Sequence, residues 1–427
     1  MKRLVALSLA VLMTLPAFSY AENLNHVFNG LENFLLTLNQ KPIVEQKPQN
    51  NNLVNPSSKR VVLGNERITK DFSYLIDGKR IGLVTNQTGV NADMVKTVDL
   101  LYNYPKATLT SIYSPEHGLD GKARAGAYVD SYTDTRLNLP VYSLYGKTRE
   151  PSKAMLDNVD VLLFDMQDIG SRTYTYISTL NYVMRAAAKH GKSVIVLDRP
   201  NPLGGTIVDG YIAQDKYLTF VGVDNLPIQH GMTVGELAQF FNRKINCNLT
   251  IVPMQNYNRN MIWQDTGLTF VATSPNIPNI TSAFGYIATG MGEGTSIGQG
   301  DKFTWVGGKG INSETFASTL NSYGLAGVTF TPETKSTRGG ARMTITDYRT
   351  FNPTKTAIYI LTTANMQKNL TVPVESGGKI PMFEKIWGGT KFGVALKSKM
   401  SAEEVIQSYQ AELNAFKAQR ENYLIYK

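Results

Sequence analysis

The chain has 427 residues, of which 42% are hydrophobic and 18% charged, values typical of a soluble globular protein long enough for two domains. The formal net charge is +9, yet the basic residues are scattered with no run of five or more, which argues against a dedicated nucleic-acid surface. A single cysteine, Cys247, excludes an internal disulfide and a metal site built on several thiolates.

The first 21 residues are typical of a secretory signal. Lys2 and Arg3 precede an apolar core at residues 4–15, and small residues end the stretch. This core is shorter than the roughly 20 residues that a membrane span needs. We therefore expect an exported protein, periplasmic or secreted, with no stable membrane insertion after cleavage of residues 1–21. Residues 22–60 predict a short amphipathic helix and a polar linker; the helix either docks on the protein or binds an unknown partner.

From residue 80 onward, short apolar runs alternate with helical patterns. This alternation predicts an α/β fold with a mostly parallel, doubly wound sheet, which we place at residues 61–230. The long loop at residues 119–140 is expected to cover a site. Strands are expected at residues 81–85, 109–113, 141–145, 161–164 and 194–197, with helices at 94–101 and from 173 onward.

Residues 231–427 are expected to form a smaller α+β domain packed on this sheet. Thr233 and Glu236 have the spacing of a capping box at the start of a helix, so Glu236 is expected to be structural. Ser401 and Glu404 repeat that spacing. Elsewhere the pattern indicates an irregular stretch at 272–312, strands at 328–330 and 343–345, and helices at 356–366 and 401–416.

Polar clusters follow four of the five predicted strands. Because parallel strands end at one edge of a sheet, these clusters converge if the strands are neighbours. Charges are costly to bury unpaired, so the pattern favours a binding or catalytic site. The clusters are Asn86 and Gln87; Glu116 and His117; Asp165, Gln167, Asp168 and Arg172; and Asp198, Arg199 and Asn201.

The motifs of several other enzyme classes are missing. The sequence has no G-x-G-x-x-G after its first strand and no G-x-x-x-x-G-K-[ST], which argues against use of dinucleotides or nucleoside triphosphates. It has no H-E-x-x-H and no G-x-S-x-G elbow. We therefore expect no metal and no cofactor. The remaining carboxylates, amides and arginines suit glycoside hydrolysis, in which a carboxylic acid protonates the leaving oxygen.

Six segments of the chain occur together in a fixed order. They are Thr85-Asn-Gln-Thr-Gly89, Ser114-Pro-Glu-His-Gly118, Asp165-Met-Gln-Asp-Ile-Gly-Ser-Arg172, Leu197-Asp-Arg-Pro-Asn-Pro202, His230-Gly-Met-Thr-Val-Gly-Glu236 and Ser274-Pro-Asn276. Together they resemble the DUF1343 (YbbC-like) family, the NamZ-type exo-β-N-acetylmuramidases of glycoside hydrolase family 171. The resemblance covers about residues 65–427.

The resemblance implies a Rossmann-like domain, a smaller C-terminal domain and an active cleft between them. It also implies release of N-acetylmuramic acid (MurNAc) from the non-reducing ends of peptidoglycan fragments, such as MurNAc-GlcNAc and muropeptides. In one segment the chain departs from the family, which usually carries Asn and Arg where this sequence has Ser296 and Gln299. Arg binds carboxylates bidentately and Gln cannot, so the departure predicts an altered substrate preference.

Glu116 is the candidate catalytic acid, because Pro115 and Gly118 restrict the backbone of its loop. His117 either orients Glu116 or fills a polar pocket. Glu293 lies in a Gly-rich stretch and is either a second acidic group or a ligand of a sugar hydroxyl.

Asp168 is either catalytic or paired with Arg172 to hold the turn. We expect Glu116, Asp168 and Asp198 to gather around one sugar-sized hollow. Tyr174 and Tyr176 are expected to pack rather than to stack on sugar. The candidate substrate-binding residues are Asn86, Gln167, Arg172, Asp198, Arg199, His230, Ser274 and Asn276.

Two other functions remain open from the sequence. One is a catalytically weak murein-binding protein, suggested by the change at Gln299. The other is a cell-wall hydrolase that acts on an ester or amide bond. Inverting, retaining and substrate-assisted hydrolysis also remain open, because the choice depends on the separation of the carboxylates.

Overall fold

The structure is a computed structural model that describes residues 59–427. The predicted signal at residues 1–21, and nearly all of the predicted helix and linker at 22–60, lie outside the described residues. Within residues 59–427, no helix is both long and apolar enough to cross a membrane.

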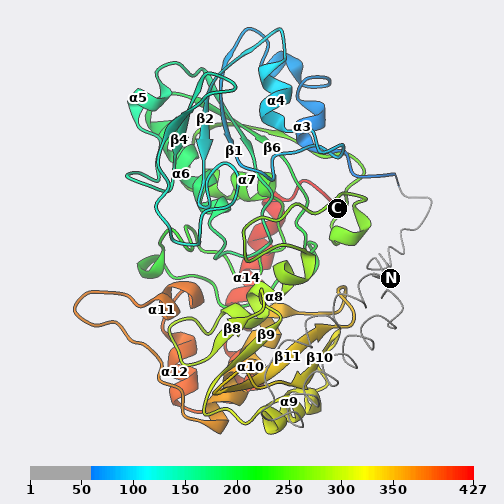
Figure 1. Cartoon of the computed structure of the whole chain (residues 1–427), viewed down its shortest axis with the longest axis vertical. Coiled ribbons are helices and arrows are strands. Elements are labelled where there is room, and N and C mark those ends of the chain that lie inside the picture. Colours follow the sequence, from blue (N-terminus) through cyan, green and yellow to red (C-terminus); the bar gives the residue numbers. More distant parts are fainter. Residues whose placement is uncertain (1–58) are drawn as a thin grey trace, which may run out of the picture. The chain divides into compact units, whose positions relative to one another are not determined.

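A seven-stranded sheet forms the centre of the first part of the chain (Figure 1). All neighbouring strands are parallel except the edge pair β3–β4. In the order in which they pair, the strands are β3 (Tyr132–Asp134), β4 (Leu139–Ser143), β2 (Thr108–Ser114), β1 (Arg80–Thr85), β5 (Val161–Asp165), β6 (Ser193–Leu197) and β7 (Asn248–Val252). The five predicted strands are confirmed as members of one mostly parallel sheet.

Helices cover both faces of this sheet. Along β5, Leu162 and Phe164 join the apolar cluster that includes residues of α6 (Tyr176–Lys189) and α7 (Val234–Ile245). Val161 and Leu163 join a second cluster, which includes residues of α4 (Thr97–Tyr102). Successive side chains of a strand point to opposite faces, so a sheet buried on both faces needs a nearly continuous apolar run. The predicted doubly wound α/β fold is confirmed.

The predicted boundary between residues 61–230 and 231–427 is wrong. Strand β7 pairs in parallel with β6, so α7 and β7 complete the first sheet. Only the last residue of β7, Val252, is fully buried, because β7 is an edge strand. It therefore lacks the apolar run that marks the central strands. The predicted capping box of Thr233 and Glu236 at the start of α7 is confirmed.

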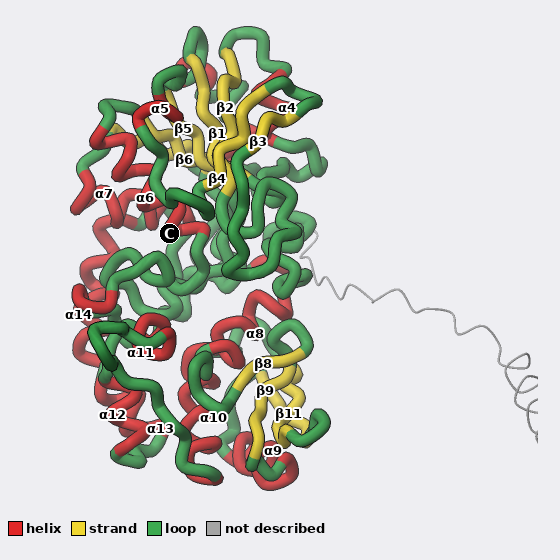
Figure 2. Tube along the Cα trace, turned by 60° about the vertical axis from the view of Figure 1, so that its left-hand side comes forward, coloured by secondary structure: helices red, strands yellow, loops and turns green. Residues whose placement is uncertain are grey.

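The second part of the chain contains a four-stranded antiparallel sheet, which Figure 2 shows as a separate group of strands. Its strands, in pairing order, are β10 (Val328–Pro332), β11 (Arg338–Ile345), β9 (Trp305–Lys309) and β8 (Gly298–Gly300). The expectation of an irregular stretch at 272–312 is wrong, since β8, β9 and α8 (Ile280–Gly290) lie within it. Glycine-rich strands lack the β-branched side chains by which strands are usually identified.

The predicted helix at 401–416 is two helices, α13 (Ala402–Ser408) and α14 (Gln410–Arg420), which meet at Tyr409. The capping box of Ser401 and Glu404 is confirmed. The remaining elements are α3 (Gly64–Arg67), η1 (Ser73–Leu75), α5 (Lys153–Leu156), η2 (Asp215–Tyr217), η3 (Trp263–Asp265), α9 (Ser313–Ser322), α10 (Pro353–Gln367), α11 (Met382–Trp387), α12 (Lys391–Lys397) and η4 (Glu421–Tyr423).

The end of the chain returns to the first sheet. The ring of Phe240 on α7 lies 5.7 Å from the ring of Phe416 and 5.2 Å from that of Tyr423, both edge to face. The hydroxyl of Tyr426 donates a hydrogen bond of 2.7 Å to Asp198 at the end of β6. The last helix thus connects the two parts of the chain.

Candidate active site

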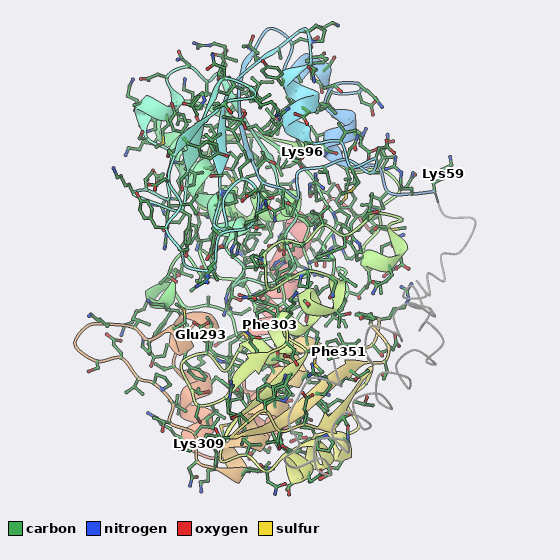
Figure 3. The ribbon with its side chains drawn as sticks, viewed as in Figure 1. Lys59, Lys96, Glu293, Phe303, Lys309 and Phe351 are labelled. Carbon is green, nitrogen blue, oxygen red and sulfur yellow. The ribbon has the colours of Figure 1, made fainter. Side chains whose placement is uncertain are left out.

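A cleft of about 690 Å³ is lined by residues from both parts of the chain. This volume lies within the range of small-molecule sites. Figure 3 labels Glu293 and Phe303, which line the cleft where the two parts of the chain meet. The polar and aromatic residues around the cleft include Glu116, Tyr145, Thr173, Thr175, Asn276, Tyr286, Glu293, Gln299, Phe303 and Arg338.

Glu116 lies in the loop that follows β2, and its side chain is held from two directions. The backbone N–H of Gly126 donates to Oε1 at 2.8 Å, and the hydroxyl of Thr175 donates to Oε2 at 2.6 Å. Thr175 is the N-cap residue of α6, whereas Gly126 belongs to the long loop at 119–140. These two bonds fix the direction of a carboxyl group that lines the cleft.

His117 supports this arrangement without lining the cleft. Its φ of 71° lies in the left-handed region, which non-glycine residues adopt at a cost. Its Nδ1 lies 2.7 Å from the carbonyl oxygen of Ala123, so Nδ1 carries the proton, because a carbonyl can only accept. The backbone N–H of Ala123 donates back to the carbonyl of His117 at 3.1 Å. His117 therefore fixes the loop that brings Gly126 to Glu116.

Glu293 supplies a second carboxyl group from the second part of the chain. It follows α8 in a glycine-rich turn, and partial burial raises its pKa above the usual value for glutamate. Tyr286 on α8 lies near both acids: burial raises the pKa of its hydroxyl, and the charges of Glu293 and Glu116 raise it further. The cleft thus contains two carboxyl groups, and the aromatic ring of Tyr286 lies near both.

The polar clusters at the strand ends do converge, but they form a packed network instead of an open site. Asp165 accepts from Nε of Arg199 at 2.5 Å, and both side chains are buried. Gln167 donates through Nε2 to the carbonyl oxygens of Asp168 and Pro200. Gln167 and Arg199 are thus bonded to neighbouring residues and do not line the cleft, and their substrate-binding roles stay predictions.

Asn86 and Asp198 also have structural roles. The side-chain oxygen of Asn86 accepts from the backbone N–H and the hydroxyl of Thr88, which closes a local turn. Asp198 accepts from the backbone N–H of Gly235 at 2.7 Å and from the hydroxyl of Thr233 at 2.9 Å. It thereby satisfies the start of α7. Neither Asn86 nor Asp198 lines the cleft.

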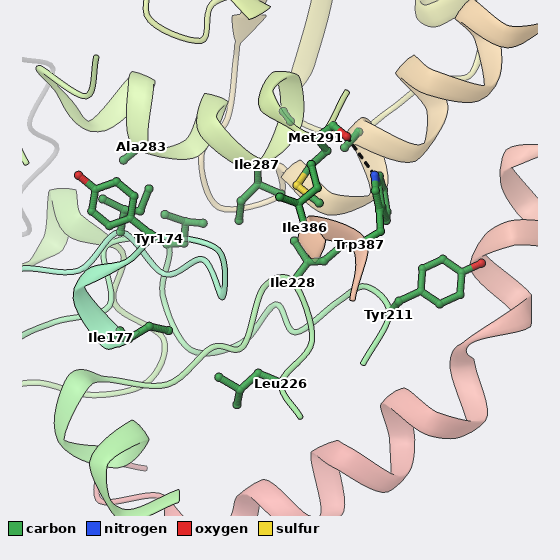
Figure 4. Close-up of a cluster of buried hydrophobic side chains, with 14 of the residues drawn as sticks. Tyr174, Ile177, Tyr211, Leu226, Ile228, Ala283, Ile287, Met291, Ile386 and Trp387 are labelled. Atoms are coloured by element: carbon green, nitrogen blue, oxygen red, sulfur yellow. Dashed lines mark hydrogen bonds between the residues drawn. The ribbon is translucent and has the colours of Figure 1, made fainter. Parts of the chain in front are cut away.

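Arg172 does not bind substrate in this arrangement. Its guanidinium is fully buried and donates to three backbone carbonyls, those of Tyr211, Leu226 and Ile386, at 2.6 to 2.8 Å. Burial lowers its pKa to about 9. Figure 4 shows these three residues around one apolar cluster with Trp387. Arg172 therefore links, by hydrogen bonds, segments that are distant in sequence. Its predicted role as a substrate-carboxylate ligand is wrong.

Asp168 and His230 face each other in the interior, away from the cleft. Asp168 accepts from the backbone N–H of Gly170 at 2.7 Å, and burial raises its pKa to about 7. The N–H of Met232 donates to Nδ1 of His230, which leaves the proton on Nε2, 3.8 Å from Asp168. Burial lowers the pKa of His230 to about 3, so it stays neutral. The expected gathering of Asp168, Asp198 and Glu116 around one hollow is wrong; of the three, only Glu116 lines the cleft.

Of the two remaining candidates, Asn276 lines the cleft and Ser274 lies outside it, buried beside Tyr174. Tyr174 and Tyr176 pack as predicted, with ring centroids 4.9 Å apart. Their hydroxyls donate to the hydroxyl and the carbonyl of Thr273, respectively. Figure 4 shows Tyr174 in contact with the buried cluster.

The stretch that departs from the family motif lies at the cleft. Gln299, the central residue of β8, lines it, whereas Ser296 precedes β8 and is exposed. Residues 294–298 match the letters G-x-S-x-G, but a strand and not a helix follows, so Ser296 is not placed on a nucleophile elbow.

Among the polar and aromatic residues of the cleft, six were not identified from the sequence: Tyr145, Thr173, Thr175, Tyr286, Phe303 and Arg338. Tyr145 and Thr175 approach Glu116 from a loop and a helix start, and its charge raises the pKa of Tyr145 in addition to burial. Tyr286 and Arg338 belong to α8 and β11. In the sequence, Thr175 stands close to the motif that ends at Arg172. This closeness is the one sequence signal that pointed to any of these cleft residues.

Comparisons with known proteins found matches over most of the described residues. Two family models match the chain, those of the N-terminal and C-terminal parts of the exo-beta-N-acetylmuramidase NamZ, at residues 81–281 and 284–426. A relative, the peptidoglycan beta-N-acetylmuramidase NamZ of Bacillus subtilis (strain 168), is 41% identical over 382 residues, 86% of this chain and 92% of the relative. The two matches divide beyond β7, as the sheet topology does.

Two solved structures of DUF1343 family proteins from Bacteroides fragilis NCTC 9343 share the fold. One is 33% identical with a TM-score of 0.76, and the other is 26% identical with a TM-score of 0.65. Each match covers 86% of this chain and 99% of the other chain. The whole described body therefore corresponds to a known architecture.

The buried carboxyl group of Asp168 predicts a pH-dependent stability. Its pKa is about 7 in the folded chain and about 4 when unfolded, so between these values the unfolded chain releases a proton that the folded chain keeps. The free energy of unfolding then falls as the pH rises from 4 to 7, and this group accounts for about 2–4 kcal/mol of the fall. Asp168→Asn should remove this part of the fall. The free energy of unfolding of the variant should therefore increase relative to that of the wild type as the pH rises.

Urea unfolding of both proteins at pH 4.5 and 7.5 measures the difference. Asp130→Asn, which changes an exposed aspartate that forms no ion pair with a described residue, is the matched control and should follow the wild type at both values. An equal fall in the free energy of unfolding of the wild type and of Asp168→Asn across this range would contradict the raised pKa of Asp168.

Proposed function

The chain belongs to the NamZ family of exo-beta-N-acetylmuramidases, and we propose that it releases MurNAc from the non-reducing ends of peptidoglycan fragments. It is accordingly a glycoside hydrolase that acts on peptidoglycan. The observation that carries the proposal is the carboxyl group of Glu116, oriented by two hydrogen bonds toward a cleft that also contains Glu293. Disaccharides such as MurNAc-GlcNAc and short muropeptides match the volume of the cleft.

In the proposed reaction, Glu116 gives its proton to the glycosidic oxygen as the bond to the anomeric carbon breaks. Glu293, on the opposite part of the chain, stays ionised and stabilises the positive charge that develops on the sugar or activates the attacking water. Its raised pKa makes it a stronger base than an exposed glutamate. Water supplies the hydroxyl of the released sugar, and its remaining proton restores the acid.

Glu116→Gln should abolish most of the turnover, because the amide keeps the shape of the side chain but has no proton to transfer. We expect kcat for release of MurNAc from MurNAc-GlcNAc, whose sugar hydroxyl is a poor leaving group without a proton, to fall about 10²- to 10⁴-fold, with an unchanged circular dichroism spectrum. Undiminished turnover by this variant would rule out Glu116 as the acid.

Mass analysis of digested MurNAc-GlcNAc separates the proposed function from its alternatives. Free MurNAc is the expected product. Saturable binding without release of a sugar would indicate a murein-binding protein, which the change at Gln299 suggested, and cleavage of an ester or amide would indicate a different hydrolase.

The pH dependence of kcat should report Glu293. As the pH falls through its raised pKa, Glu293 becomes protonated and loses the charge that the reaction needs, so kcat falls. The midpoint of this acidic limb should lie above the ordinary glutamate pKa of about 4.3. Glu293→Gln should lower kcat and remove this limb. Glu314→Gln, at an exposed position in the first turn of α9, is the control and should keep the wild-type profile. A limb that persists in Glu293→Gln would reassign it to another group.

We also propose that the protein is exported, as residues 1–21 indicate and as a substrate in the cell wall requires. The mature chain should then begin at Glu22, which N-terminal sequencing of the protein from the periplasm or the medium would establish. Retention of Met1 in the cytoplasmic fraction would contradict export.

A further inference from the structure

Charge in the cleft presents a problem for the proposed substrate. MurNAc differs from N-acetylglucosamine by a lactyl ether that ends in a carboxylate. Two acidic residues, Glu116 and Glu293, already line the cleft and repel such a group. Gln299, beside Gly298 on β8, is neutral. A cation from elsewhere is needed to favour an anionic sugar.

Arg338 is the one lysine or arginine among the cleft-lining residues of the described chain. It stands at the start of β11, two strands away from Gln299 on β8. The guanidinium nevertheless reaches β8: its Nη2 lies 3.1 Å from the point where a Cβ on Gly298 would be. Arg338 therefore places its charge beside the residue that precedes Gln299.

The strand between them leaves a path for this side chain. β9 presents Gly307 opposite Gly298, and Gly307 has no side chain to block the crossing. Nη2 of Arg338 donates to the carbonyl oxygen of Gly307 at 3.1 Å, and the guanidinium carbon lies 5.0 Å from the ring centre of Trp305. These contacts hold the stem of Arg338 across β9 while other N–H groups remain free.

The neighbouring cations are neutralised, whereas Arg338 is not. Lys335 and Arg342 both form ion pairs with Asp301 and Glu333. Among the described residues, Arg338 has no carboxylate within ion-pair distance, and its side chain is exposed. Of the five N–H donors of its guanidinium, one makes a hydrogen bond with a described residue. The pattern is that of a cation available to a ligand.

We propose that Arg338, from the start of β11, binds the lactyl carboxylate of the terminal MurNAc. The inference rests on the proposed function, whose substrate carries that carboxylate. A guanidinium fits a carboxylate through two parallel N–H donors, which gives both affinity and orientation. Arg338 is thus a specificity-determining residue, distinct from the two acids that carry out hydrolysis.

A matched pair of substrates tests the proposal: an aryl N-acetylmuramide and the same compound with the lactyl carboxylate converted to a carboxamide. The wild type should prefer the carboxylate. Arg338→Gln should lower kcat/KM about 10- to 100-fold for the carboxylate, mainly through KM, with little change for the carboxamide. Lys335→Gln, which changes a cation near the same Trp305 ring but outside the cleft, is the control and should keep the wild-type ratio.

A relocation of the charge makes the test more specific. Adding Gly298→Arg to Arg338→Gln should restore the preference for the carboxylate, since the new arginine stands at the point that the guanidinium of Arg338 reaches. An unchanged substrate ratio in Arg338→Gln overturns the inference. Equal losses on both substrates also overturn it, because they indicate a structural role for Arg338.

Failure of the inference can be told apart from failure of the proposed function. A wild-type protein that releases the aryl group from neither substrate contradicts the function. Calorimetric binding of MurNAc and of its carboxamide to wild type and Arg338→Gln then still decides the role of Arg338. Loss of the difference between the two sugars in the variant supports the inference, and a wild type that binds both sugars equally overturns it.

Discussion

Charge that is buried at the carboxyl ends of the parallel strands must be neutralised, and this constraint organises the molecule. Asp165 ends the central strand β5 in an apolar interior, where an unpaired carboxylate would be very costly. Arg199, from the end of β6, pairs with it, and Asn65 and Thr97 donate to its second oxygen. The strand ends are thereby locked together, and the loops beyond them are carried on a rigid base.

The same constraint explains why the sequence predicts the fold well and the site only in part. Apolar runs such as residues 161–164 identify buried parallel strands, and the structure contains each of them. Polar residues at strand ends indicate convergence, yet they do not distinguish an open site from a filled one. Asp198 and Gln167 bond to neighbouring residues in the interior, whereas Glu116, in the loop after β2, lines the cleft.

The half of the cleft that was hardest to foresee comes from strands with little recognisable pattern. β8 and β9 are rich in glycine, and the missing side chains leave room for those of neighbouring residues. Gly307 and Gly340 accommodate the indole of Trp305, whose ring supports Arg338. Such a role depends on the pairing of strands distant in sequence, so no local pattern reveals it. Glu293 was identified from the sequence because this glutamate belongs to a recognisable motif.

The bond from Gly126 to Glu116 has a consequence for how this enzyme can diverge. The donor is a main-chain amide, so the bond depends on the course of the backbone at position 126 and not on a side chain. Gly126 has a φ of 74°, which most other residues tolerate poorly. Selection on this loop should therefore act on its length and turn geometry, while its exposed side chains vary freely between species.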